Sequence, residues 1–203
     1  MTRQEPRLST LVLCAGLVAV TAGSVGAQTA SQAAPGAAAK AAVPAADKDF
    51  AQKAAIGGLA EVQLGTLAQQ KASNAQVKQF GSHMVEDHSK ANDELKQIAS
   101  AKGLALPTDL DATHKSKVAK MEKLSGAEFD RAYMDEMVAD HKKDVAEFRK
   151  QSTSGKDSDL KAFAGKTLPT LEDHLKMAQS TDAAVKSGGK SNKSAMADAP
   201  AKP

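Results

Sequence analysis

The chain is poor in aromatic residues. Among its 203 residues there is no Trp, one Tyr and five Phe, so aromatic side chains make up only 3% of the sequence. β-Sheets are enriched in aromatic and β-branched residues, whereas alanine and lysine, which dominate here, favour helices. The composition excludes a β protein and predicts an all-α fold.

Cysteine is almost absent as well. The single cysteine, Cys14, lies within residues 1–27, where two arginines precede an apolar run at 8–20 and small residues follow at 25–27. This pattern is typical of a cleaved secretory signal peptide. The run is shorter than the roughly 20 residues that span a bilayer, so we expect no transmembrane segment after cleavage. The exported chain would have no thiol for a disulfide or a thiolate metal site, and we expect it in the periplasm or cell envelope.

An excess of charge of one sign is also missing. The formal net charge is +3, and acidic and basic residues are interleaved. The sequence therefore offers no electrostatic basis for binding nucleic acid. It also has no Ser-His-Asp order and no glycine-rich phosphate loop, which favours a protein that is not an enzyme. An envelope partner or a homo-oligomer is compatible with this composition, and neither is identified by it.

Both ends of the chain have compositions that cannot form a core. Residues 28–46 are rich in alanine and proline and predict a disordered linker. Residues 187–203 are rich in glycine, serine, lysine and alanine and predict a disordered tail. A single folded domain is therefore expected over residues 47–186.

Within that domain the apolar residues recur at helical spacing. The expected long helices span residues 47–72, 74–102 and 125–152 and a segment from 157 onward. A crossover at 104–126 contains Pro107 and a short helical pattern at 111–124. Two hairpins joined by such a crossover form a four-helix bundle in which the second and third long helices run parallel.

One short pattern occurs three times on these helices. Met84-Val85-Glu86-Asp87-His88 is echoed by Met137-Val138-Ala139-Asp140-His141 and, in shorter form, by Glu172-Asp173-His174. Each histidine falls on or beside the apolar stripe of its helix, and Glu61 occupies a stripe position in the first helix. At about 1.5 Å of rise per residue, His88 and His141 come to nearly the same depth, while His174 is offset by a few residues. We therefore expect one polar side chain from each helix in a single interior layer.

The combined spacings are typical of a known family. They are Phe50-x3-Ala54-x3-Gly58-x2-Glu61-x2-Leu64, Met84-x2-Asp87-His88, Ser125-Gly126-x2-Phe129-Asp130-x2-Tyr133, Met137-x2-Asp140-His141 and Leu168-Pro169-x4-His174. Over residues 47–182 the chain resembles the DUF4142 family, secreted bacterial proteins of unknown function that are distantly similar to ferritin-like bundles. The resemblance implies a ferritin-like four-helix bundle.

A ferritin-like di-iron centre is not expected, however. Such centres use a Glu-x-x-His pair from each of two helices, and here Val85, Val138 and Leu171 stand three residues before the histidines. One glutamate and three histidines suit a single zinc or copper ion better.

Two interpretations of the layer remain open. In the first, Glu61, His88, His141 and His174 bind one metal ion in a protein with a stress or metal-handling role. Residues in supporting positions would be Asp87, Asp140 and Asp173, which orient imidazoles across helices, Met84 and Met137, whose thioethers favour copper, and Tyr133. In the second, the same polar groups form a buried hydrogen-bond network that sets helix register in a structural or interaction protein of the envelope, and the methionines only fill the core.

Overall fold

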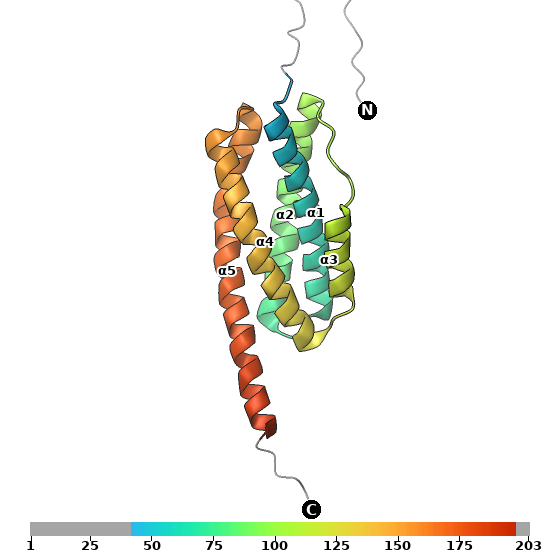
Figure 1. Cartoon of the computed structure of the whole chain (residues 1–203), viewed down its shortest axis with the longest axis vertical. Coiled ribbons are helices and arrows are strands. Elements are labelled where there is room, and N and C mark those ends of the chain that lie inside the picture. Colours follow the sequence, from blue (N-terminus) through green and yellow to red (C-terminus); the bar gives the residue numbers. More distant parts are fainter. Residues whose placement is uncertain (1–41, 198–203) are drawn as a thin grey trace, which may run out of the picture. The chain divides into compact units, whose positions relative to one another are not determined.

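The computed structural model describes residues 42–197, with side chains up to residue 188. These residues form five helices and no strand (Figure 1), which confirms the all-α prediction. The predicted signal peptide and most of the predicted linker lie outside the described residues, as do residues 198–203. No described helix is both long enough and apolar enough to cross a membrane.

The helix boundaries follow local signals in the sequence. The helices are α1 (Ala45–Lys71), α2 (Ala75–Lys102), α3 (Ala112–Glu122), α4 (Gly126–Ser154) and α5 (Ser158–Ala197). The side chain of Asn74 accepts a hydrogen bond of 2.8 Å from the Gln76 amide and caps α2. At the other end of α2, Gly103 adopts a left-handed conformation with φ of 66°, which glycine tolerates without strain.

The last helix is longer than the sequence indicated. We predicted a tail from residue 187 onward, whereas α5 continues to Ala197. Alanine and lysine in this stretch favour helix, and the next proline comes only at Pro200. Extending an existing helix costs far less than nucleating a new one, so the two glycines after Ser187 do not end it. The first helix likewise begins at Ala45, inside the predicted linker.

The four long helices pair as two hairpins. α1 packs mainly on α2, and α4 packs mainly on α5, while α2 also contacts α5 and α1 contacts α4. The short α3 lies against α1 within the crossover, as Figure 1 shows. The α1–α2 contact is close at Gly65 and Gly81, where an added Cβ on Gly65 would lie 2.7 Å from the Gly81 carbonyl oxygen.

Two buried carboxylates fasten the ends of the bundle. Asp130 on α4 accepts hydrogen bonds of 3.0 Å from the backbone amides of Ser73 and Asn74, where α2 begins. Asp47 on α1 accepts from the Lys156 and Asp157 amides in the turn between α4 and α5. Each carboxylate satisfies amides that have no partner within their own helices, so it also fixes the helix depth.

The apolar core is divided into two parts. We call one the Tyr133 cluster; its residues include Leu64, Phe80, Met84, Phe129, Tyr133, Met137 and Ala178. The other is the Phe148 cluster, which includes Phe50, Ala55, Leu95, Val145, Phe148, Phe163 and Leu171. On each of the four long helices, a stretch that belongs to neither cluster separates the residues of the Tyr133 cluster from those of the Phe148 cluster. One buried polar residue lies in each of these four stretches: Glu61, His88, His141 and His174.

Candidate metal centre

Three histidines from three helices meet between the two clusters. One ring nitrogen from each of His88 on α2, His141 on α4 and His174 on α5 lies within 4.8 Å of the others. The ring centroids are 5.4 to 5.8 Å apart. All three side chains are buried, with exposed fractions of 7%, 0% and 2% respectively. The offset of His174 along its helix therefore does not keep it out of the layer.

Hydrogen bonds fix the tautomer of two of the three rings. Nδ1 of His141 lies 3.0 Å from the Met137 carbonyl oxygen, and Nε2 of His174 lies 3.0 Å from Oδ2 of Asp87. A carbonyl and a carboxylate can only accept, so each of these nitrogens donates its proton. The opposite nitrogens, Nε2 of His141 and Nδ1 of His174, are left with free lone pairs in the neutral rings.

In the part of the chain that the structure describes, these two nitrogens have no hydrogen-bond partner, and neither does one ring nitrogen of His88. Nε2 of His88, Nε2 of His141 and Nδ1 of His174 are buried, and none makes a hydrogen bond within the described part of the chain. An unsatisfied buried polar atom costs about 1–3 kcal/mol. Three of them in one place are unusual for a core network, in which each polar group pairs with another. His141 and His174 have the form that metal-binding imidazoles take, in which one nitrogen is held by an acceptor and the other is free.

Burial keeps these imidazoles neutral. It lowers the pKa of His88 well below the usual value, and the neighbouring histidines lower it further. Burial, together with His174, also lowers the pKa of His141 to about 4. The pKa of His174 falls for the same reason, although Asp87 partly opposes the shift. Because metal ions bind the neutral imidazole, these side chains are ready to coordinate at neutral pH.

Glu61 is buried in α1 but is not part of the three-histidine group. Among residues 42–188 its Oε2 atom has no hydrogen-bond partner, and the same is true of the hydroxyl of Tyr133. Burial, and then the charges of Asp144 and Asp140, raise the pKa of Glu61 well above the usual value. Burial and Glu61 raise the pKa of Tyr133 as well. The carboxyl group is therefore held in its neutral form as long as nothing positive compensates it.

The residues predicted in supporting positions have different roles. Asp87 holds the His174 ring across the α2–α5 contact. Asp140 instead binds the ammonium of Lys117 at 2.6 and 2.9 Å, and Asp173 binds that of Lys176 at 2.9 Å. An aspartate that precedes a histidine points about 100° away on the helix, so only a neighbour on another helix can reach the ring.

Both predicted methionines lie in the Tyr133 cluster and are fully buried. Met137 contributes to the site through its backbone carbonyl, which accepts the His141 proton.

The site is bordered by two further residues, Phe80 and Asp144, which the sequence analysis did not single out. The Phe80 ring lies 6.2 Å from that of His141 and 6.4 Å from that of His174, so it covers the imidazoles on the side of the Tyr133 cluster. Asp144 has a pKa raised to about 7, mainly by burial. Each lies at helical spacing from a histidine on its own helix, two turns before His88 and one turn after His141. This spacing in the sequence could have identified both residues as neighbours of the histidine layer.

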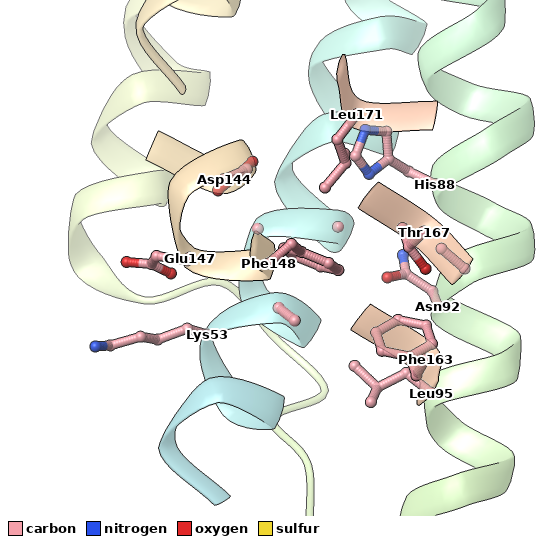
Figure 2. A pocket seen from close by; sticks show the side chains of 14 residues that line it. Lys53, His88, Asn92, Leu95, Asp144, Glu147, Phe148, Phe163, Thr167 and Leu171 are labelled. Atoms are coloured by element: carbon pink, nitrogen blue, oxygen red, sulfur yellow. The ribbon is translucent and has the colours of Figure 1, made fainter. Parts of the chain in front are cut away.

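A small cavity adjoins the histidine layer. It has a volume of about 30 Å³, and His88 forms part of its wall. The side chains around it come from all four long helices, as Figure 2 shows for Lys53, Asn92, Asp144 and Thr167. A space of this size accommodates about one water molecule.

Comparisons with known proteins support the fold and the family. The family model "Domain of unknown function (DUF4142)" matches residues 32–181. The crystal structure of a DUF305 fragment from Deinococcus radiodurans superposes with a TM-score of 0.62 at 11% sequence identity, covering 70% of this chain and 98% of the fragment. At that identity the likeness shows a shared helical-bundle fold alone. No curated protein matches the sequence.

Proposed function

Because the chain belongs to the DUF4142 family, whose function is unknown, we propose a function from its own site: it binds one zinc or copper ion through His88, His141 and His174. Two observations carry this proposal: the three buried histidines each bring one ring nitrogen within 4.8 Å of the others, and each has a ring nitrogen without a hydrogen-bond partner in residues 42–188. A metal ion would satisfy all three lone pairs at once, which no single hydrogen-bond donor can do.

The ligand chemistry supports a borderline ion. Imidazole suits zinc and copper, and three imidazoles leave one position open in a tetrahedral site. Glu61, in the same layer with an unpaired Oε2 atom, is our candidate for that position. We do not propose a di-iron centre, because such a centre needs carboxylates that bridge two irons, and no carboxylate belongs to the three-histidine group.

The alternative is that the histidines only set helix register. The Asp87–His174 hydrogen bond between α2 and α5 favours this, since it links two helices that must align. Histidines that only set helix register would not need unpaired nitrogens, however. Each unpaired nitrogen lowers the stability of the metal-free protein. The metal function accounts for that cost, because binding energy recovers it.

Metal analysis of the purified protein tests the proposal directly. The protein is prepared without chelator or polyhistidine tag, supplied with zinc or copper, and compared with a His88→Ala, His141→Ala double variant. We expect close to one ion per wild-type chain and none in the double variant. His83→Ala is the matched control, because His83 also lies on α2 but outside the three-histidine group.

Two outcomes would contradict the function. One is a wild-type protein that holds no metal after supply and dialysis. The other is a double variant that retains as much metal as the wild type while circular dichroism shows it folded. A variant that loses metal together with its helical signal is replaced by the single His141→Gln change, which keeps a polar side chain of similar size.

We further propose that the protein is exported and handles its metal ion in the periplasm or cell envelope. Support comes from residues 1–27, whose arginines, apolar run and small residues match a signal peptide. Mass spectrometry of the protein from an envelope fraction should give an N-terminus near Gln28. A protein that keeps residues 1–27 and stays in the cytoplasm would refute this part of the proposal.

A further inference from the structure

The cavity beside His88 extends from the buried layer towards the protein surface. Its lining includes the buried His88, the half-buried Glu147 and the exposed Lys53. Lys53 is well exposed, with 56% of its side chain accessible to solvent. Figure 2 shows Asp144 and Glu147 on α4 at one side of the cavity and His88 and Asn92 on α2 at the other.

Two adjacent glycines of α1 border this space and have different roles. A Cβ atom on Gly58 would lie 2.0 Å from Oδ1 of Asn92, so Gly58 is needed for the close contact between α1 and α2. A Cβ atom on Gly57 would meet no atom within 4 Å. Glycine weakens a helix interior relative to alanine, and at Gly57 no close contact with the described residues accounts for its presence. Because glycine has no side chain, Gly57 adds no atoms that would fill the cavity.

The charges along the cavity favour a cation. Asp144 and Glu147 line it from α4, and the nearby charges that act on Asp144 are those of Asp140, Glu147, Lys143 and Lys117. The one cationic group at the wall, Lys53, pairs with Asp49 on its own helix at 2.8 Å. A carboxylate in a partly enclosed space attracts cations from solution, and a partly buried pair is screened less by salt than an exposed one.

We propose that this cavity is the entry route of the metal ion, with Glu147 and then Asp144 as the carboxylates that meet the cation and Gly57 as the residue that keeps the route open. The inference rests on the proposed function and concerns how the same site is filled. The cavity holds about one water molecule, so the ion exchanges most of its hydration shell for oxygen atoms of the wall. His88, whose Nε2 atom is unpaired, is the first imidazole on this path.

Loading kinetics test the route. The metal-free protein is mixed with Co²⁺ in a stopped-flow instrument, and the absorption of cobalt bound to imidazoles reports occupancy. In Gly57→Leu a long side chain enters the cavity, and we expect loading to slow roughly tenfold or more, equivalent to about 1.4 kcal/mol on the barrier. The final occupancy should stay as in the wild type, because no ligand is changed. Gly57→Ala is the matched control, since it gives the same gain in helix propensity with one methyl group only.

A second pair of variants tests the charge. At pH 8, above the Asp144 pKa of about 7, the carboxyl group is mostly ionised. There Asp144→Asn should slow loading most at low salt and lose this effect at high salt, because it removes an electrostatic attraction. Asp173→Asn is its control, as Asp173 also lies on a helix that supplies a histidine but pairs with Lys176 at the surface.

Equal loading rates in the wild type and in Gly57→Leu would overturn the route while the proposed function stands. So would a slow phase in Ser180→Leu alone, because Ser180 lines a separate hollow with His83 and Met177. A wild-type protein that binds no cobalt, zinc or copper refutes the proposed function, and the route with it.

Discussion

Replacing His88 by leucine separates a metal site from a structural network. The His88 ring lies beside those of His141 on α4 and His174 on α5, and its Nε2 atom is buried without a hydrogen-bond partner in the described part of the chain. In a metal site the Nε2 atom binds the ion, and in the metal-free protein the same atom is unsatisfied and lowers the stability. In a structural network the imidazole makes hydrogen bonds that stabilise the fold, and its loss destabilises the protein. The two interpretations predict opposite signs for His88→Leu.

The magnitude follows from the unpaired nitrogen. Leaving a buried polar atom unsatisfied costs about 1–3 kcal/mol, and leucine fills a similar volume without any polar atom. We therefore expect the free energy of unfolding of the metal-free protein to rise by about 1–2 kcal/mol. In a domain of this size each kcal/mol raises the midpoint temperature Tm by about 2–4 °C. With zinc at a thousandfold excess over Kd the wild type should gain about 4 kcal/mol, and the variant should gain nothing.

The assay is thermal unfolding followed by circular dichroism at pH 7.5, with chelator or with zinc. The pH is chosen because the His88 pKa lies well below it, so the imidazole is neutral and no charge is removed by the change. Met84→Leu serves as the control, since Met84 is fully buried one turn away on α2. This swap conserves volume and should cost less than about 1.5 kcal/mol while zinc still stabilises the protein.

A drop of 1–2 kcal/mol or more in His88→Leu under chelator would refute the reasoning, because it would mean that the native protein satisfies the imidazole by itself. A stabilised variant that still gains stability from zinc would locate the metal elsewhere in the chain.

Further changes should act as follows. Asp87→Asn should weaken zinc affinity in a competition titration by about 10- to 100-fold, because Asp87 orients the His174 ring, whereas Asp173→Asn should leave it unchanged. The folded-state pKa of His141 is about 4, below its usual 6.5. Neutral His141 therefore supports the metal-free fold above pH 6.5, and this contribution is lost as the pH falls towards 4. In urea unfolding, the free energy of unfolding of His141→Gln should therefore fall by on the order of 2–3 kcal/mol less than that of the wild type between pH 6.5 and pH 4. The same pH dependence in the variant and the wild type would contradict the lowered pKa. Asp130→Ala should lower the free energy of unfolding by about 2–4 kcal/mol, since Asp130 holds the start of α2; a loss below 1 kcal/mol would mean that water replaces its hydrogen bonds.

Much of the bundle was predictable because it depends on local signals. Apolar spacing, Asn74 as a cap and Gly103 as a stop placed α2 within a residue of its observed ends. Helix length and hairpin connection also indicated that His88 and His141 would lie at one depth, and their ring centroids are 5.8 Å apart. The end of α5 was predicted too early, because glycine and serine content indicated a tail where a formed helix simply continues.

The candidate site was predictable in its histidines and less so in their surroundings. Asp87, Asp140 and Asp173 look alike in sequence, yet one holds a histidine and the other two bind lysines. Which partner an aspartate finds depends on the neighbouring helix and its rotation, and the periodicity of a single helix contains neither. The cavity was missed for the same reason, since a void exists only between helices that have packed. Asp144 could have been found from its position one turn after His141 on the same helix.

The sequence by itself determined the helices, their order and the one polar residue that each long helix places on its apolar stripe, because spacing along a helix decides which residues share a face. Only the tertiary structure decided that three imidazole nitrogens face one another without partners. It alone also decided that Glu61 stands outside the three-histidine group, and that a bare glycine, Gly57, borders a space leading to His88. These are properties of the distances between helices, set by how two apolar clusters close around a polar layer.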